Sequence, residues 1–388
     1  MGDVAEQIRG VTFAKADAIS EPEPGRTAIL RAGNITDRGL ALRDLVYVPS
    51  TRVAERQRLR PGDIVIATSS GSLSVVGKAS RVEAPIDAAF GAFLKVLRPR
   101  QDRIDPSYFA HYFQTPAYRH RVSAAAAGAS INNLRTADLD EVELPLPPLD
   151  EQRRIARILD AADDLRVRRR RSINALGQLG EAIVPTSPPT QAQLGDLLDR
   201  IESGRSPVCE TRPAESGEWG VLKLGAVSSS EYRPSENKAM LSAEVPDHDL
   251  VVAAGDILLA RKNTLELVGT SVFVSSTPPR LLLPDLIFRL VPRTDAPVTA
   301  RYLQAALAQP EVRHQIRRLA GGSAGSMPNI SKTRLLTVSI GVPPLEVQKR
   351  FDEASEAAGR RLRDAREHLA QLDALFASLQ QRAFAGEL

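Results

Sequence analysis

Basic and amide side chains follow predicted strands of the chain, at positions from which they could contact a nucleic acid. Arg261, Lys262 and Asn263 come directly after an apolar run, and Lys78 and Arg81 take a similar place earlier in the chain. Arginine, lysine and asparagine hydrogen-bond phosphate oxygens and the edges of bases. The pattern predicts that these five residues contact DNA.

Two short polar loops are further candidates for DNA contact. Residues 130–133 include Asn132 and Asn133, and residues 326–329 end in Asn329. Loops of small polar residues could approach a nucleic-acid backbone closely or could simply be tight turns. We therefore treat Asn132, Asn133 and Asn329 as candidate DNA contacts. The alternative is that the two loops are simply tight turns.

The sequence lacks the residue patterns of an enzyme. It has no Gly-rich phosphate loop, no Asn-Pro-Pro-aromatic motif for an extrahelical adenine, and no metal-pair spacing among its five histidines. Its single cysteine, Cys209, lies in a polar turn, which is typical of an incidental thiol and excludes a disulfide framework. We therefore expect no catalytic residue, metal or cofactor in this chain. Without a signal peptide or a long apolar segment, it is expected to be cytoplasmic.

Charge alone favours DNA binding only weakly. The formal net charge is +4 over 388 residues, from 51 basic and 47 acidic side chains. Such a charge steers DNA effectively only where it is clustered. One cluster consists of Arg166 and residues 168–171 in a predicted helix. A solvated helix face is the simpler explanation of this cluster, and DNA contact is the alternative.

The elements that must position these residues occur twice. Residues 61–67 (PGDIVIA) and 254–260 (AGDILLA) are separated by 193 residues. Further anchors recur in the same order at offsets of 192 to 196: Gly2-Asp3-Val4 with Gly195-Asp196-Leu197, Val76-Gly77 with Val268-Gly269, Tyr108 with Tyr302, Asn133 with Asn329, and Pro147-Pro148-Leu149 with Pro343-Pro344-Leu345. The period far exceeds that of a solenoid and indicates a duplicated domain.

Each copy begins with a mixed α/β (α+β) globular domain. Apolar runs between Gly, Pro and Ser predict strands, within residues 27–35, 63–69 and 93–99 of the first copy and 219–227, 256–262 and 286–292 of the second. Helical periodicity follows in residues 106–126 and 299–319.

Each copy ends in a predicted long helix, which starts after Pro-Pro-Leu because proline suits the first helical turn. Apolar or small residues recur every three or four positions, which is typical of coiled-coil packing. In the first helix, residues 150–183, they are Ile155, Ile158, Ala162, Leu165, Leu176, Leu179 and Ile183, with a break at Arg169 and Ser172. In the second they are Phe351, Ser355, Ala358, Leu362, Ala365, Leu369, Leu372, Phe376, Leu379 and Ala383. We expect the two helices to pair.

The predicted organisation has four parts. They are a first domain at residues 1–148, a central helix at 149–185, a second domain at 186–343 and a distal helix at 344–388. The Pro- and Thr-rich residues 185–193 form the predicted linker between the copies.

These repeated motifs carry a resemblance that covers essentially the whole chain. Gly-Asp-Ile-(Val/Leu)-(Ile/Leu)-Ala occurs twice, residues 144–152 (LPLPPLDEQ) lead into the first long helix, and the sequence ends in SLQQRAFAGEL (378–388). Together they resemble the specificity subunit of type I restriction-modification systems. The second copy departs at Val347, which stands where the first has Glu151, and a helix-capping contact is expected to be lost there.

The resemblance implies a division of labour between subunits. Two target-recognition domains, separated by two antiparallel helices, would each read one half of an asymmetric bipartite site in double-stranded DNA. The helices would set the spacing and dock two methyltransferase subunits, which bind S-adenosylmethionine and methylate adenine N6. Restriction subunits would join and use ATP and Mg. The alternative is a targeting or scaffold subunit of another anti-phage defence system with the same architecture.

Overall fold

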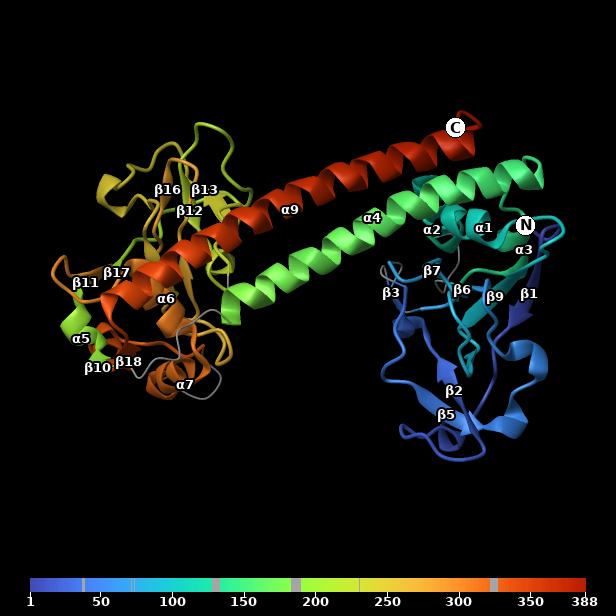
Figure 1. Ribbon diagram of the computed structural model, residues 1–388, viewed down its shortest axis with the longest axis horizontal. Helices are drawn as coiled ribbons and strands as arrows, with labels where there is room; N and C mark the ends of the chain where they lie inside the picture. Colours follow the sequence, from blue (N-terminus) through green and yellow to red (C-terminus); the bar gives the residue numbers. More distant parts are fainter. Residues whose placement is uncertain are drawn as a thin grey trace. The chain divides into compact units, whose positions relative to one another are not determined.

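The computed structural model describes residues 1–36, 39–70, 72, 74–127, 133–182, 190–229, 231–321 and 327–388. The chain forms two compact units (Figure 1). Unit 1 comprises Met1–Ile173 and Asp364–Leu388, and unit 2 comprises Asn174–Arg363. Asn132 and Ile183 lie outside the described residues.

Unit 1 contains short strands and helices. Its strands are β1 (Ala5–Arg9), β2 (Arg26–Leu30), β3 (Ile35–Thr36), β4 (Gly39–Leu40), β5 (Val46–Pro49), β6 (Ile64–Ala67), β7 (Ala79–Arg81), β8 (Ala88–Phe90) and β9 (Leu94–Pro99). Its helices are α1 (Pro106–Tyr112), α2 (Pro116–Ala127), α3 (Thr136–Asp140), most of α4 (Leu149–Ala182) and the end of α9 (Leu345–Ala385). The strands form sheets in the orders β1-β9-β6-β7, β5-β2-β8 and β3-β4.

The sheet β1-β9-β6-β7 is the middle layer of unit 1. Ile64 and Ile66 of β6 belong to a core cluster with the helices, whereas Val65 and Ala67 belong to a second cluster with β2, β8 and β9. This assignment follows from the alternation of side chains along a strand. In Figure 1, α1 and α2 lie on one side of β6 and β9, and β2 and β5 lie on the other.

Unit 2 repeats this plan. Its strands are β10 (Thr190–Gln193), β11 (Leu198–Ser203), β12 (Gly220–Leu222), β13 (Asn237–Ala239), β14 (Ile257–Ala260), β15 (Ser271–Phe273), β16 (Leu281–Leu282), β17 (Ile287–Pro292) and β18 (Ser339–Val342). Its helices are α5 (Leu194–Leu197), α6 (Ala300–Ala308), α7 (Pro310–Leu319), α8 (Lys332–Leu336) and parts of α4 and α9.

The strand order supports the duplication. The sheet β11-β17-β14-β15 matches β1-β9-β6-β7, and β13-β12-β16 matches β5-β2-β8, each with one antiparallel and one parallel pairing. Ile257 and Leu259 of β14 face the helical core, and Leu258 and Ala260 face the second sheet. The Gly-Asp-Ile motif therefore places the central strand of each unit between two cores.

The aspartate of that motif anchors its strand to the strand beside it. Asp63 is 1% exposed, and its Oδ1 lies 2.8 Å from Nε of Arg98 on β9. In unit 2, Oδ2 of Asp256 lies 3.2 Å from Nη1 of Arg289 on β17. Each arginine also donates to backbone carbonyls, so both ion pairs are satisfied and structural.

Most predicted segments contain the expected element, with three corrections. Each of the six apolar runs contains a strand. The two regions of helical periodicity are broken at Pro116 and Pro310, because a proline inside a helix removes a backbone hydrogen bond. The predicted linker 185–193 is shorter than expected, since Thr190–Gln193 forms β10 and pairs antiparallel with β18.

Within unit 1, α4 and the end of α9 run antiparallel. Arg154 Nη2 donates to the carbonyl of Leu388, and Arg166 Nε lies 2.6 Å from Oδ1 of Asp373. The guanidinium of Arg166 also lies 4.2 Å from the ring centroid of Phe376. Residues further along α4 therefore contact residues nearer the start of α9, as expected for two antiparallel helices.

The buried side of α4 differs from the predicted seam. Ile155 is 3% exposed and Ile158 is half-buried, while Leu159, outside the predicted seam, is fully buried. Leu165, expected to pack between the helices, is 51% exposed. The reason is that the first turns of α4 pack on the core of unit 1 as well as on α9, and this core reaches no further along α4 than Ala162.

Candidate nucleic-acid interface

The same backbone frame surrounds the end of the central strand in both units. In unit 1, Ser69 forms a β-bridge with Asn133, and the N–H of Leu134 donates to the carbonyl of Thr68 at 2.8 Å. In unit 2, Lys262 forms a bridge with Asn329, and the N–H of Ile330 donates to the carbonyl of Arg261 at 3.0 Å.

A second loop joins each frame at an apolar residue. The N–H of Thr68 donates to the carbonyl of Phe93 at 2.9 Å. The N–H of Arg261 donates to that of Leu286 at 3.0 Å. Each unit thus fixes three chain segments around one point with backbone hydrogen bonds, which leaves the side chains at that point free to differ.

Unit 2 brings the four predicted polar residues of the second copy together. Arg261 Nε donates to Oδ1 of Asn329 at 3.1 Å, and its guanidinium lies 5.4 Å from the ring centroid of Phe288. Asn263 is 7% exposed, and its Nδ2 donates to Oγ of Ser228 at 3.2 Å. Lys262 and Asn329 are bridged and half-buried. Asn263 is therefore a support of the surface, while Arg261 and Lys262 form its basic part.

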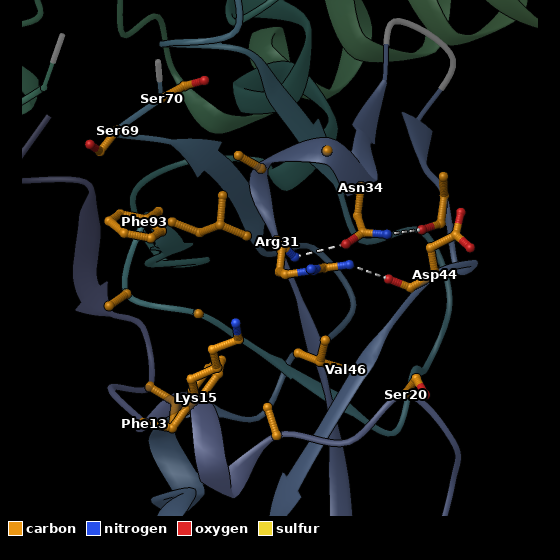
Figure 2. Close-up of a pocket in the computed structure, with 18 of the residues that line it drawn as sticks. Phe13, Lys15, Ser20, Arg31, Asn34, Asp44, Val46, Ser69, Ser70 and Phe93 are labelled. Carbon is orange, nitrogen blue, oxygen red and sulfur yellow. Dashed lines mark hydrogen bonds between the residues drawn. The ribbon is translucent and has the colours of Figure 1, made fainter. Parts of the chain in front are cut away.

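Unit 1 has a wide concavity at the corresponding place, with a volume of about 1500 Å³. Its wall includes Ser69 and Ser70 from the end of β6, Phe93 from the loop between β8 and β9, and residues around the ends of β1 and β2 (Figure 2). Asn34 closes one side: its Oδ1 accepts from the N–H of Arg31 at 2.8 Å, and its Nδ2 donates to the carbonyls of Ala41 and Arg43.

Exposed cations line this concavity. Lys15, Arg31 and Arg43 are exposed, and within the described part of the chain none of them forms an ion pair. The Nη2 of Arg31 donates to the backbone carbonyl of Asp44 at 2.7 Å, which orients the guanidinium without neutralising it. The carboxylate of Asp44 also lines the concavity, but the three cations outnumber it. The surface therefore presents net positive charge beside hydroxyl groups, as a binding site for phosphates and base edges requires.

The predicted contacts of the first copy do not all reach this concavity. Asn133 is exposed at its frame, whereas Lys78 is half-buried in the turn before β7 and is absent from the wall. Arg81 follows the alternation of β7, in which Ala79 packs on the helical core, and its charge helps to lower the pKa of Asp160 on α4. Arg81 therefore faces the helical layer, because a residue two positions along a strand shares its side.

The arginine cluster of α4 is partly used inside unit 1. Arg166 and Arg170 both contact Oδ1 of Asp373, at 2.6 and 3.0 Å. Beside them is a groove of about 540 Å³, lined by Leu165, Arg168, Arg169, Ser172, His368, Gln371, Leu372 and Leu375. The predicted packing residues Leu176, Leu362, Leu369, Leu372 and Leu379 are half-buried, and Phe376 is 4% exposed.

Two buried glutamines fix the starts of the long helices. Gln152 Oε1 accepts from the N–H of Asp105 at 2.9 Å, and its Nε2 donates to the carbonyl of Pro147 at 2.8 Å. Gln348 repeats this with Thr299 and Pro343. The presence of Val347 in the second copy, where the first has Glu151, removes no helix-capping contact. Glu151 forms an exposed ion pair with Arg154, at 2.6 Å, rather than a capping contact.

Other chemistry is not built into the described ranges. They contain no group of three or more His, Cys, Asp or Glu side chains placed to hold a metal ion. Nor does any helix within them have the length and apolarity needed to cross a membrane.

Sequence reasoning missed the residues that line the unit 1 concavity. Arg31, Arg43 and Phe93 lie on loops and Lys15 begins a short 3-10 helix (Lys15–Asp17), and the sequence marked none of the four as a DNA contact. One signal was available: Phe93 precedes β9 at the position equivalent to Leu286 before β17. The repeat could therefore have marked Phe93 as a loop position beside the candidate surface.

The two units together define a duplicated α/β protein with one backbone frame and two different polar surfaces. Residues 1–175 match the model of the type I restriction modification DNA specificity domain. The EcoKI specificity subunit of Escherichia coli (strain K12) is 29% identical over 99% of this chain and 87% of that protein. The StySPI specificity subunit of Salmonella potsdam has the same identity and coverage. The chain is therefore similar to specificity subunits of type I restriction enzymes over nearly its whole length, and its first 175 residues match the domain model of that family.

Solved structures show the same fold. The S subunit of a type I restriction-modification system from M. genitalium has a TM-score of 0.58 and 14% identity, over 98% of this chain and 94% of that one. A chain from a structural description of complex assembly and conformational transition in a type I R-M system has a TM-score of 0.53 and 18% identity, over 99% and 98%.

Proposed function

We propose that each unit of this chain reads one half of an asymmetric, bipartite site in double-stranded DNA. The observation that carries the proposal is the pair of equivalent frames. Where unit 1 has Thr68, Ser69 and Ser70, unit 2 has Arg261 and Lys262 followed by Asn263. Equal backbones with different hydrogen-bonding groups suit two half-sites of different sequence, because side chains at base edges carry the specificity.

The proposed DNA contacts differ between the units. In unit 2 they are Arg261, Lys262 and Asn329. In unit 1 they are Asn133, Ser69 and Ser70 with the cations of the concavity. Asn132 and Lys78 stay candidates from the sequence. The charges support phosphate contacts, and the hydroxyl and amide groups support contacts with base edges.

The helices α4 and α9 are proposed to set the distance between the half-sites and to dock two methyltransferase subunits. The antiparallel contacts in unit 1 support pairing in the manner of a coiled coil. The groove beside them supports docking, because Leu165 is 51% exposed and Leu375 is 50% exposed next to Arg168 and Arg169. Apolar anchors rimmed by polar groups are typical of protein interfaces. S-adenosylmethionine, ATP and Mg would be bound by the methyltransferase and restriction subunits.

The test begins with the full chain co-expressed with a type I methyltransferase subunit. Adenine methylation across the genome of cells that express both proteins identifies the motif. Binding of the purified complex is then measured on duplexes with single base changes. We expect changes in either half to weaken binding by about 1–3 kcal/mol each and changes in the gap to have little effect.

A continuous motif, or binding indifferent to the motif, would contradict the proposal. The control is the same complex with a scrambled duplex at equal salt, since phosphate contacts alone give binding without sequence preference. A complex that forms with another type of partner and shows no methylated motif would favour the scaffold function instead.

A further inference from the structure

An aromatic side chain projects into the concavity of unit 1, whose wall also includes the apolar residues Val11, Phe13 and Ile19. Phe93 is 68% exposed, and among the described residues it is the only aromatic one of the large apolar side chains that are exposed. It lies in the loop between β8 and β9 and lines the concavity with Ser69 and Ser70 (Figure 2). The exposed cations Lys15 and Arg31 line the same concavity. A large exposed apolar group on a wall that combines cations with apolar residues favours a ligand that has both phosphate groups and an apolar feature.

Hydrogen bonds fix the backbone of Phe93 in its loop. Its carbonyl accepts hydrogen bonds from the N–H of Thr68 at 2.9 Å, from the hydroxyl of Thr68 at 3.1 Å and from the N–H of Ser69 at 3.2 Å. Thr68 is 3% exposed, so these bonds are tied to the buried end of β6. Because a phenyl group has two side-chain torsions, little freedom is lost when it contacts a ligand.

The equivalent position in unit 2 is also apolar. Leu286 accepts from the N–H of Arg261 as Phe93 does from Thr68, and it is half-buried. The frame thus places an apolar side chain beside hydrogen-bonding groups in both units, while its type and exposure differ.

We infer that Phe93 is a specificity-determining residue that contacts the C5-methyl group of a thymine in the half-site read by unit 1. The inference rests on the proposed function. Thymine alone presents a methyl group in the major groove, and phenylalanine is among the side chains that contact it. The serine hydroxyls beside Phe93 can hydrogen-bond either base edge, so the apolar contact would decide between a T·A pair and a C·G pair.

The experiment removes the methyl group and the phenyl group separately. Each thymine of the methylated motif is replaced in turn by deoxyuridine, which lacks the methyl group, and binding to the complex of full chain and methyltransferase is measured. For the wild type, we expect one substitution in one half-site to weaken binding about three- to fivefold, as loss of one buried methyl predicts. Phe93→Ala should bind both duplexes equally, and Phe93→Leu should keep part of the difference.

Leu42→Ala is the matched control. Leu42 is 52% exposed in the same unit and lies outside the wall of the concavity, so this variant should keep the wild-type response to deoxyuridine. The inference is overturned if the wild type prefers its motif but ignores every thymine methyl. It is equally overturned if the affinity of Phe93→Ala still falls on replacing thymine by deoxyuridine as in the wild type. That result would include a variant whose affinity falls by the same factor for the thymine and the deoxyuridine duplex, as expected if the phenyl group wedges between bases. Failure of the wild type to prefer any motif would instead reject the proposed function.

Discussion

At the scale of single residues, a pair of buried amides has the best-defined structural role. Gln152 is 1% exposed and Gln348 is fully buried. The Nε2 of Gln348 donates to the carbonyls of Pro297 and Pro343, both at 2.8 Å, while its Oε1 accepts from the N–H of Thr299 at 2.9 Å. One side chain therefore links the start of α9 to the segment before α6 and to the end of the preceding strand β18.

Replacing Gln348 by leucine should destabilise unit 2 by about 2–3 kcal/mol. The substitution leaves one N–H and two carbonyl groups without partners in a buried place, and each unpaired group is costly. The lowered midpoint of urea unfolding, followed by circular dichroism, measures the effect. The control is Gln381→Leu, because Gln381 is exposed on the same helix. Equal midpoints for the two variants would show that the buried amide contributes nothing.

Residues in repeated motifs could be found from the sequence, but residues on loops could not. The repeat marks Gln152 and Gln348 because both copies need the same backbone link. It cannot mark Lys15 or Arg43, which line one surface and differ between copies. Arg81 was a candidate DNA contact because its charge lies at the end of a predicted strand. Charge alone does not reveal which side of the sheet a residue faces, whereas the strand register does.

At the scale of elements, a buried histidine joins three helices of unit 1. His111 of α1 is 4% exposed, and its Nε2 lies 2.8 Å from Oδ1 of Asp160 on α4. Its ring packs 5.9 Å from that of Phe376 on α9, and Gln380 of α9 donates to its carbonyl. Ser107 of α1 also donates to Asp160. The end of α9 thus docks on unit 1 through contacts at one junction.

This junction should be weakened by acid. Burial by itself would raise the pKa of Asp160, but hydrogen bonds from His111 and Ser107 hold it below the usual 3.8. Because the pKa is lower in the folded state, the ionised carboxylate stabilises the fold above about pH 3.8, and this contribution is lost as the pH falls through the folded-state pKa. Asp160→Asn should therefore lower the urea midpoint most at pH 6, and its difference from the wild type should shrink below pH 4.

Asp164→Asn provides the control for the pH dependence. The side chain of Asp164 is 73% exposed, and its ion pair with Arg168 has a separation of 3.9 Å. Exposed pairs of this kind contribute little, so this variant should follow the wild type across the whole range. A difference between Asp160→Asn and the wild type that does not change with pH would contradict the assigned role of the carboxylate.

Element types followed from the sequence more readily than their partners did. The Pro-Pro-Leu motifs placed the starts of α4 and α9 within about one residue. The heptad pattern could not show that α4 first packs on the core of unit 1, which buries Leu159 and leaves Leu165 exposed. Composition also suggested a linker at residues 185–193, but Thr190–Gln193 forms an edge strand because β18 offers its backbone for pairing.

At the scale of the whole molecule, duplication predicts that specificity can be exchanged one half at a time. Each unit has its own core clusters and its own frame. Unit 1 depends on residues far along the chain, however. Phe376 and Ala383 of α9 are part of its core, and the ring of Phe384 lies 5.1 Å from that of Tyr108. An exchanged domain must keep the contacts with these residues.

Replacing residues 1–145 by those of a relative with a different motif should therefore change one half-site and leave the other unchanged. The donor should have tyrosine at position 108 and histidine at position 111, so that the docking of α9 is preserved. Genome-wide adenine methylation in cells that express the chimera with the methyltransferase gives the new motif. Its gap should also be unchanged, because α4 and α9 are retained. The control chimera takes the same segment from a relative with the same first half-site, and its motif should equal that of the parent. A chimera that folds and methylates with both half-sites altered would show that the two units do not read DNA independently.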